Sequence, residues 1–372
     1  MSTRSPQRAG PSAPVRAPRR RADRDRRGFT AAFAVLALAL ALVAVVLAST
    51  ATGAVDLSPL DAARLLLGHL VPGMPWMTDG TYTVLQDQAV WGFRLPRALL
   101  AALAGASLAL AGALMQAVVH NPLAEPYVLG VSSGAGVGAV LVVVGGAVGG
   151  LSLSTAAFAG AATATAAVYL LARRNGRIAP QRLILAGVAL GALFSAITSY
   201  LTLTTEAQNV FSVMFFLLGS VSAATMDSLL APALALLVAL IVVGANVRGI
   251  NALLVGDEAA ASLGVSVDRL RTVLLLVSAL LVGAVVSVSG SIGFVGLIIP
   301  HIARILVGTD HRIMLPVSVL GGAVFLTAAD LMARTVAAPV EIPIGILTAV
   351  IGAPFFLWLL RRDRASTVGM DR

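Results

Sequence analysis

Side chains that do chemistry are scarce in this 372-residue chain. It contains no cysteine, and all 26 basic residues are arginines because lysine is absent as well. The missing cysteines exclude disulfides, thiolate metal sites and a cysteine nucleophile. The missing lysines exclude Schiff-base chemistry and an ordinary Walker A loop, which needs Gly-Lys-[Ser/Thr]. The four histidines (His69, His120, His301 and His311) lack metal-ligand spacing, so we expect no enzyme active site, no cofactor and no metal site.

Charge is concentrated at the N-terminus. Nine arginines lie before Gly28, among four prolines and few apolar residues, so we expect residues 1–28 to be a disordered cytoplasmic tail that touches anionic lipid. A specific partner site and a cleaved signal peptide are the alternatives. Without these nine arginines and two nearby aspartates, 17 basic residues face 15 acidic ones. The net charge of +9 therefore does not indicate nucleic-acid binding.

Composition indicates an integral membrane protein. Apolar residues make up 58% of the chain and charged residues 12%, whereas soluble domains contain roughly 45–50% and about 25%. About 20 apolar residues form a helix that crosses a bilayer. Ten such segments are present, at residues 29–49, 95–118, 128–149, 154–173, 183–204, 226–247, 270–290, 292–307, 314–334 and 342–361. The stretch 210–221 is too short to cross, and we expect it to form a re-entrant or interfacial helix on the outer side.

The arginines also predict the orientation of these spans. With both termini in the cytoplasm, 22 arginines lie inside and only Arg64, Arg94, Arg97 and Arg334 lie outside. The transmembrane domain then covers residues 29–362, and residues 363–372 form a short cytoplasmic C-terminus. The position of the outer arginines needs a physical explanation. Arg94 and Arg97 lie at a helix N-terminus, where positive charge opposes the helix dipole.

Several local patterns predict structure without assigning function. Asp330 precedes Arg334 by one helical turn, which favours a structural ion pair. Residues 256–267 suit a short cytoplasmic helix, with acidic residues at its start and Gly264 at its end; a plain connector is the alternative. Asn121-Pro122 and Glu125-Pro126 predict a structural, non-helical turn. Small residues at helical spacing, such as Gly105 and Gly112, predict close helix packing.

Ordered motifs over residues 29–362 resemble the permease subunit of the ABC importers for iron–siderophores, haem and vitamin B12, which has the type II importer fold. They include Arg94-Leu95-Pro96-Arg97, Asn121-Pro122-Leu123-Ala124-Glu125-Pro126, Leu129-Gly130-Val131-Ser132-Ser133-Gly134-Ala135, Gly256-Asp257-Glu258-Ala259-Ala260, Gly293-Phe294-Val295-Gly296-Leu297-Ile298-Ile299-Pro300-His301 and Glu341-Ile342-Pro343-Ile344-Gly345. One departure is Phe215-Phe216-Leu217, where the family often has tryptophan.

The resemblance implies an all-α, multi-pass protein of the bacterial cytoplasmic membrane with about ten transmembrane helices. It implies alternating access, driven by separate ATPase subunits, for a ferric siderophore, haem or cobalamin. A second permease copy or a paralogue and an extracytoplasmic substrate-binding protein are the other expected partners. A secondary transporter is the alternative; it needs inward-facing acids within the spans, and Asp330 is the one candidate.

The same resemblance implies three groups of site residues. Arg94, Arg97 and Arg334 would accept carboxylates of the binding protein, with lipid headgroups or local pairing as the alternative. The coupling helix that docks on the ATPase would contain Gly256, Asp257, Glu258, Ala260, Leu263 and Gly264. The pathway would be lined by the fifth and tenth spans and the 210–221 helix. Ser195, Ser199 and Thr202 recur at spacings of four and three on the fifth span, so their own spacing predicts a polar face toward the pathway, unless these hydroxyls bond within their helix. Ala179, Pro180 and Gln181 would lie near the cytoplasmic gate.

Overall fold

The computed structural model describes residues 19–145, 152–174 and 177–368. In this part of the chain the regular elements are helices, together with two short antiparallel strands, β1 (Arg173–Arg174) and β2 (Arg177–Ile178), which pair with each other. The longer helices are α1 (Arg19–Ala51), α4 (Leu95–Val119), α6 (Leu153–Ala172), α7 (Pro180–Thr204), α9 (Leu230–Leu253), α11 (Val267–Ser289), α13 (His311–Thr335) and α14 (Ile344–Val368). The shorter ones are α2 (Pro59–Leu70), η1 (Pro75–Met77), α3 (Val84–Asp87), the π-helix η2 (Gln88–Arg94), η3 (Pro126–Leu129), α5 (Val131–Gly145), α8 (Ala207–Leu218), η5 (Asp227–Leu229), α10 (Asp257–Ser262) and α12 (Val295–Val307).

Each predicted span coincides with helix in the described part of the chain; residues 146–149, the end of the third predicted span, lie outside that part. Among the described residues, seven helical stretches are long and apolar enough to cross a membrane: Thr30–Ala51, Val84–Val119, Leu153–Ala172, Pro180–Thr204, Asp227–Leu253, Val267–Ser289 and His311–Thr335. Four shorter apolar helices are Val131–Gly145, Ala207–Leu218, Val295–Val307 and Ile344–Leu359. The predicted all-α membrane fold is therefore confirmed, and α8 occupies the stretch expected to be too short to cross.

Two helices extend beyond their expected limits. α1 begins at Arg19, so the tail expected to be disordered is helical over residues 19–28; residues 1–18 lie outside the described part. α14 continues to Val368, past the expected start of the C-terminal segment at residue 363. Arginine has a high helix propensity, and a helix that already exists is extended at little cost because each added residue gains one hydrogen bond.

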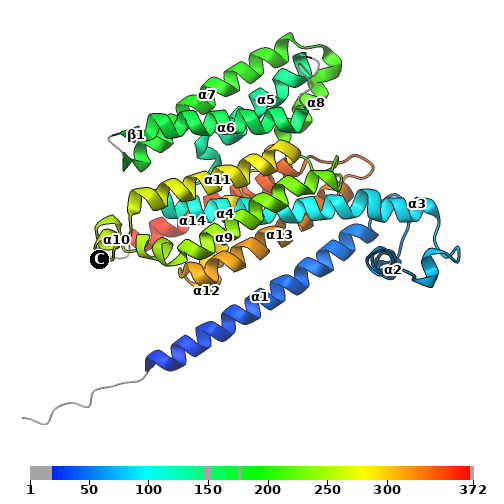
Figure 1. Ribbon diagram of the computed structural model, residues 1–372, viewed down its shortest axis with the longest axis horizontal. Coiled ribbons are helices and arrows are strands. Elements are labelled where there is room, and N and C mark those ends of the chain that lie inside the picture. Colours follow the sequence, from blue (N-terminus) through cyan, green and yellow to red (C-terminus); the bar gives the residue numbers. More distant parts are fainter. Residues whose placement is uncertain (1–18, 146–151, 175–176, 369–372) are drawn as a thin grey trace, which may run out of the picture.

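Connections that the arginine distribution assigns to opposite sides lie at opposite ends of the bundle. In Figure 1 the β1–β2 hairpin, α10, the beginning of α1 and the end of α14 lie toward one end, while α2, α3 and α8 lie toward the other. We call these the cytoplasmic end and the outer end. Both described chain ends are thus at the cytoplasmic end, as the prediction requires.

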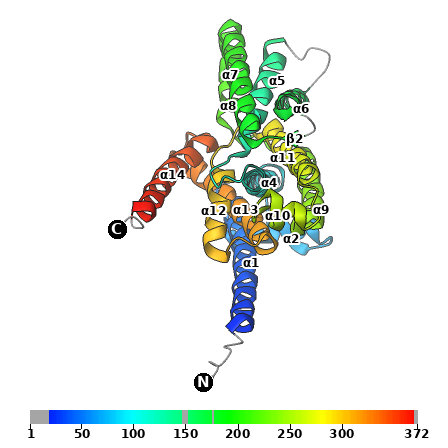
Figure 2. The same cartoon turned by 90° about the vertical axis from the view of Figure 1, so that its left-hand side faces the viewer.

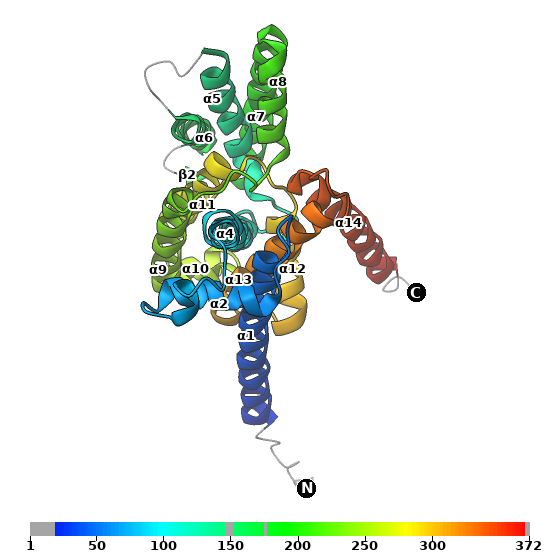
Figure 3. The ribbon, with the colours of Figure 1, turned by 90° about the vertical axis from the view of Figure 1, so that its right-hand side faces the viewer.

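α4 lies at the centre of the bundle (Figures 2 and 3) and packs against α13 and α12 through glycines. A Cβ atom on Gly105 would lie 2.0 Å from the carbonyl oxygen of Gly322 in α13, and one on Gly112 would lie 2.0 Å from that of Gly296 in α12. The predicted close packing is confirmed, because only glycine allows backbones to approach this closely.

α14 is set apart from this core. It projects away from the bundle in Figures 2 and 3, while α5, α6, α7 and α8 form a separate group. The start of α14 meets the end of α8, where a Cβ atom on Gly345 would lie 2.1 Å from the carbonyl oxygen of Leu218. The outer start of α14 is therefore held by a few close contacts rather than by a broad packed face.

Candidate functional site

Two of the outer arginines bind the C-terminal end of α1. The guanidinium of Arg94 donates to the carbonyl oxygens of Thr50 (3.1 Å), Ala51 (2.9 Å) and Val55 (2.6 Å). The unpaired carbonyls at a helix C-terminus carry partial negative charge. The positive charge of Arg94, which is unfavourable at the start of α4, is thus compensated at the end of α1.

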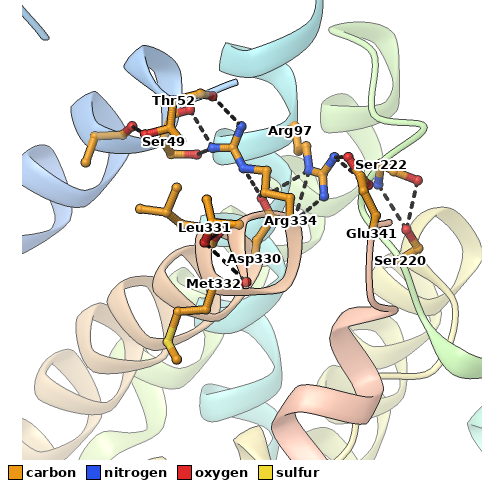
Figure 4. Close-up of polar contacts among 12 residues, drawn as sticks. Ser49, Thr52, Arg97, Ser220, Ser222, Asp330, Leu331, Met332, Arg334 and Glu341 are labelled. Atoms are coloured by element: carbon orange, nitrogen blue, oxygen red, sulfur yellow. Dashed lines mark hydrogen bonds and ion pairs between the residues drawn. The ribbon is translucent and has the colours of Figure 1, made fainter. Parts of the chain in front are cut away.

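Arg334 of α13 binds the same end of α1 (Figure 4). It donates to the carbonyl oxygen of Thr52 (2.9 Å), to the Ser49 hydroxyl (2.7 Å) and to the Ser49 carbonyl. Together Arg94 and Arg334 fasten α1 to α4 and α13. The structure gives these two charges partners within the chain, which is the local pairing expected as the alternative; contact with a binding protein stays a prediction.

Arg97 is bound by two carboxylates (Figure 4). Its Nε lies 3.0 and 3.1 Å from the two Asp330 oxygens, and its Nη1 lies 2.9 and 3.0 Å from the two Glu341 oxygens. The side chain of Asp330 is 1% exposed and that of Arg97 13%, but that of Glu341 is 45% exposed. Glu341 is therefore the member of this group that reaches solvent.

The expected Asp330–Arg334 pair is present but secondary. Arg334 Nε is 3.9 Å from Asp330 Oδ2, at the limit of an ion pair, whereas Arg97 Nη2 is 3.0 Å from Asp330 Oδ1. Asp330 thus pairs mainly with Arg97, across α4 and α13, rather than along its own helix. The acid that a secondary transporter would use is paired with arginine.

α10 forms the predicted short helix at the cytoplasmic end. Gly256 (φ +100°) precedes it and Gly264 (φ +84°) follows it, both in a backbone region that favours glycine. Asp257 and Glu258 occupy the first turn and are exposed, as the helix dipole favours. The Leu263 side chain, just after the helix, is 70% exposed.

One residue of the predicted coupling helix packs inward. Ala260 is fully buried within the permease itself, so its side chain helps to hold α10 on the bundle, and the role of residues 256–264 in ATPase coupling stays a prediction. A run of alanine and serine such as that in α10 does not reveal which face of so short a helix packs inward. The exposed side chains include Asp257, Glu258 and Leu263, beside the exposed Leu254 and Val255.

An arginine that the sequence analysis did not single out anchors α10. Arg271 of α11, with a 5% exposed side chain, places Nη1 2.9 Å from Asp257 Oδ2. Its Nη2 lies 2.9 Å from Asp257 Oδ1 and 3.2 Å from His120 Nδ1. His120 ends α4, and its Nε2 donates to the Leu253 carbonyl at 2.9 Å, so Nδ1 is free to accept from Arg271. α4, α9, α10 and α11 meet at this point.

A hollow of about 470 Å³ lies where α8, α14 and the link between α11 and α12 meet. Its lining residues are Leu217, Leu218, Ser291, Gly345, Ile346, Ala349 and Val350. These elements include two of the three predicted to line the pathway, while α7 contributes no lining residue to this hollow.

The expected pathway residues of α7 lie away from the hollow. Ser195 and Ser199 are exposed on α7, and the Thr202 hydroxyl donates to the Thr198 carbonyl at 2.7 Å. Ala179 is the N-cap of α7, and Pro180 and Gln181 are the first two residues of this helix. Proline suits this position since its missing N–H needs no partner there.

The predicted turn after α4 is confirmed and supports the link that borders the hollow. Asn121 Oδ1 accepts from Leu123 N (2.9 Å), while Glu125 Oε1 accepts from Phe294 N (2.8 Å) at the start of α12. The Tyr127 hydroxyl donates to the Ile292 carbonyl (2.9 Å) and accepts from its N–H (3.0 Å). These long-range partners were not foreseen from the sequence.

Comparison with known proteins agrees with this architecture. Residues 40–362 match the FecCD transport family. The chain is 43% identical over 316 residues to the cobalamin import system permease protein BtuC of Halobacterium salinarum, covering 82% of this chain and 85% of that protein. It is 41% identical over 293 residues to the hemin transport system permease protein HmuU of Yersinia pestis, covering 76% and 87%.

A solved structure is also similar. An inward-facing ABC transporter of the metal-chelate type aligns with a TM-score of 0.76 and 34% identity, over 88% of this chain and 98% of that one. The chain therefore belongs to the FecCD transport family and is an ABC importer permease, a multi-pass protein of the cytoplasmic membrane.

Proposed function

We propose that this chain is the membrane subunit of an importer for a metal chelate, either a ferric siderophore, haem or cobalamin, with the siderophore as the first candidate. Relatives named for cobalamin and hemin import support the class of substrate. The chain has no lysine with which to build a Walker A loop. Energy for import therefore comes from separate ATPase subunits, and the permease changes which side of the pathway is open.

The observation that carries this proposal is the exposed face of α10 at the cytoplasmic end. Leu263, Leu254 and Val255 expose apolar side chains there, beside Asp257 and Glu258. An apolar group with a charged rim suits a protein partner rather than water. α10 is also fastened to α11 and α4 through Arg271 and His120, so movement of a docked ATPase would pass directly to the bundle.

A second permease copy or a close paralogue would complete the pathway. α7 has 25 residues, of which only Leu183, Gly187 and Thr198 are buried. Its exposed Ser195 and Ser199 are polar, and polar side chains within a span normally face protein or water rather than lipid. The hollow between α8 and α14 is open on one side and would form half of the pathway.

The outer arginine group would receive the substrate-binding protein. Arg94 and Arg334 are largely buried against α1, whereas Arg97 is bound by the exposed Glu341. Among the three arginines, Arg97 is thus the one that an incoming carboxylate reaches with the least rearrangement.

The test is uptake by proteoliposomes that contain this chain with its ATPase and binding-protein partners. ATP on the side of the membrane that carries the ATPase subunits should drive accumulation of the cognate chelate on that same side. Uptake should stop when the ATPase subunit is omitted. Three chelates tested in parallel, a ferric hydroxamate siderophore, haem and cyanocobalamin, would identify the substrate. Uptake driven by a proton or sodium gradient without the ATPase would overturn the proposal.

A further inference from the structure

Glu341 differs from every other partner of the outer arginines in its exposure and its place in the chain. The partners of Arg94 and Arg334 are mostly backbone carbonyls of α1 and the turn that follows it, and Asp330 is buried inside α13. Glu341 instead belongs to the connection between α13 and α14, three residues before α14 begins. Its carboxylate holds Arg97 with two hydrogen bonds from one side (Figure 4).

We propose that Glu341 is an internal competitor of the binding protein. In the free importer its carboxylate occupies Arg97, and docking exchanges it for a carboxylate of the binding protein. This inference rests on the proposed function, because it requires a partner that presents an acidic side chain to the outer end.

The charges favour such an exchange. Asp330 remains on Arg97 when Glu341 leaves, so the buried guanidinium never loses all its counter-charge. The departing carboxylate is already half in water, and a half-exposed ion pair is held weakly. The incoming carboxylate would form its pair in a site covered by the docked protein, where charge pairs are stronger.

The exchange would also affect the start of α14. The connection before this helix is held by Glu341 and by a backbone hydrogen bond from Ile342 N to the Ala333 carbonyl, 3.0 Å long. Beyond it, Gly345 and Ile346 border the hollow between α8 and α14. Loss of the Glu341 contact therefore removes the side-chain anchor of the turn next to the proposed pathway and leaves its backbone hydrogen bonds, which would loosen the turn and link docking outside to α14.

Glu341→Gln tests the exchange, because the amide keeps the size of the side chain but not its charge. The binding-protein Kd is measured on the importer in nanodiscs. The apparent affinity for the binding protein falls in proportion to the fraction of importers in which Arg97 is free of Glu341. If Glu341 occupies Arg97 for about nine-tenths of the time, the variant should bind the binding protein about tenfold more tightly. Asp227→Asn, which removes an exposed acid at the same end, is the matched control and should change Kd less than about twofold.

An unchanged or weaker affinity for Glu341→Gln, with normal binding to the unmodified importer, would overturn the exchange while leaving the proposed function intact. If the unmodified importer binds no acidic partner protein, the proposed function fails and the exchange fails with it.

A second measurement needs no partner: spin labels on cysteines at Asp79 and Val340, in the naturally cysteine-free chain, should give a broader distance distribution in Glu341→Gln. A distribution as narrow as in the parent would show that Glu341 does not hold the turn.

Discussion

Each end of this permease pairs a buried arginine with a more exposed carboxylate, but the surroundings of the two pairs differ. At the outer end the buried Arg97 pairs with the exposed Glu341, and at the cytoplasmic end the buried Arg271 pairs with Asp257, which is 47% exposed; both N–O distances are 2.9 Å. Arg97 has a second, buried carboxylate in Asp330, whereas the other neighbour of Arg271 is a nitrogen of His120 that carries no negative charge.

This difference assigns different roles to the two exposed acids. Arg97 stays neutralised if Glu341 leaves, so the outer pair can open at low cost. Arg271 would be left without a carboxylate if Asp257 left, and an uncompensated buried charge is costly. The outer pair is thus suited to exchange, and the inner pair to holding α10 firmly on the bundle.

Asp330→Asn should have the largest effect on stability. It removes the buried carboxylate that faces both Arg97 and Arg334, and breaking a buried pair typically costs about 3–5 kcal/mol. The free energy of unfolding in nanodiscs or detergent should fall by that order, whereas the exposed Asp227→Asn should leave it unchanged. A loss no larger than that of the control would show that Glu341 alone neutralises Arg97.

Asp257→Asn should have a smaller and more local effect. Water reaches Asp257 and can partly solvate Arg271, so we expect a cost of about 1–2 kcal/mol, below that of a fully buried pair. Amide hydrogen exchange in residues 257–264 should become faster, and ATPase stimulation by the binding protein should decrease. Glu258→Gln, in the adjacent exposed position, is the control; equal changes in both variants would mean that Arg271 does not anchor α10.

Arg334→Lys should loosen the end of α1 without unfolding the bundle. Lysine is a point charge and lacks the planar fork that reaches the Ser49 and Thr52 carbonyls together. We expect a cost of about 1 kcal/mol and faster hydrogen exchange at residues 47–52. The exposed Arg64→Lys should change neither quantity, and equal exchange rates in all three proteins would contradict the role assigned to Arg334.

Single cysteines test whether the two ends lie on opposite sides, with no expected effect on stability. Asp79→Cys in the outer segment and Glu258→Cys in α10 are both at exposed positions, and the chain has no other cysteine. An impermeant maleimide added to intact cells should label position 79 only. Labelling of position 258 from outside would invert or break the proposed topology.

The helices were predictable from the sequence because a membrane span is a local feature: a continuous run of about 20 apolar residues is long enough to cross the bilayer. The ends of α10 were predictable for a similar reason, since acids at a helix start and glycine at its end act within one turn. The limits of α1 and α14 were not, because an arginine-rich segment is polar enough for disorder and also able to continue a helix that already exists.

The partners of the site residues were not predictable. Arg97 lies 233 residues from Asp330 and 244 from Glu341, so no local pattern connects them. The sequence instead favoured the Asp330–Arg334 pair, which is close along the helix but proves secondary at 3.9 Å. Similarly, nothing in the spacing of Asp257, Ala260 and Leu263 shows that the alanine is buried and the leucine exposed; tertiary packing against α9 and α11 decides this.

We propose that a separate ATPase acts on this permease through α10. Leu263→Asp tests it most directly, because the parent side chain lies in solvent and the substitution should leave folding and membrane insertion intact. The ATPase subunit should bind the variant in nanodiscs at least tenfold more weakly, because an unpaired charge would be buried in the interface. ATP-driven chelate uptake, measured on the same variant, should fall with it. Leu263→Met, which keeps an apolar side chain, should retain both. ATPase binding and uptake at parental levels in Leu263→Asp would contradict the account.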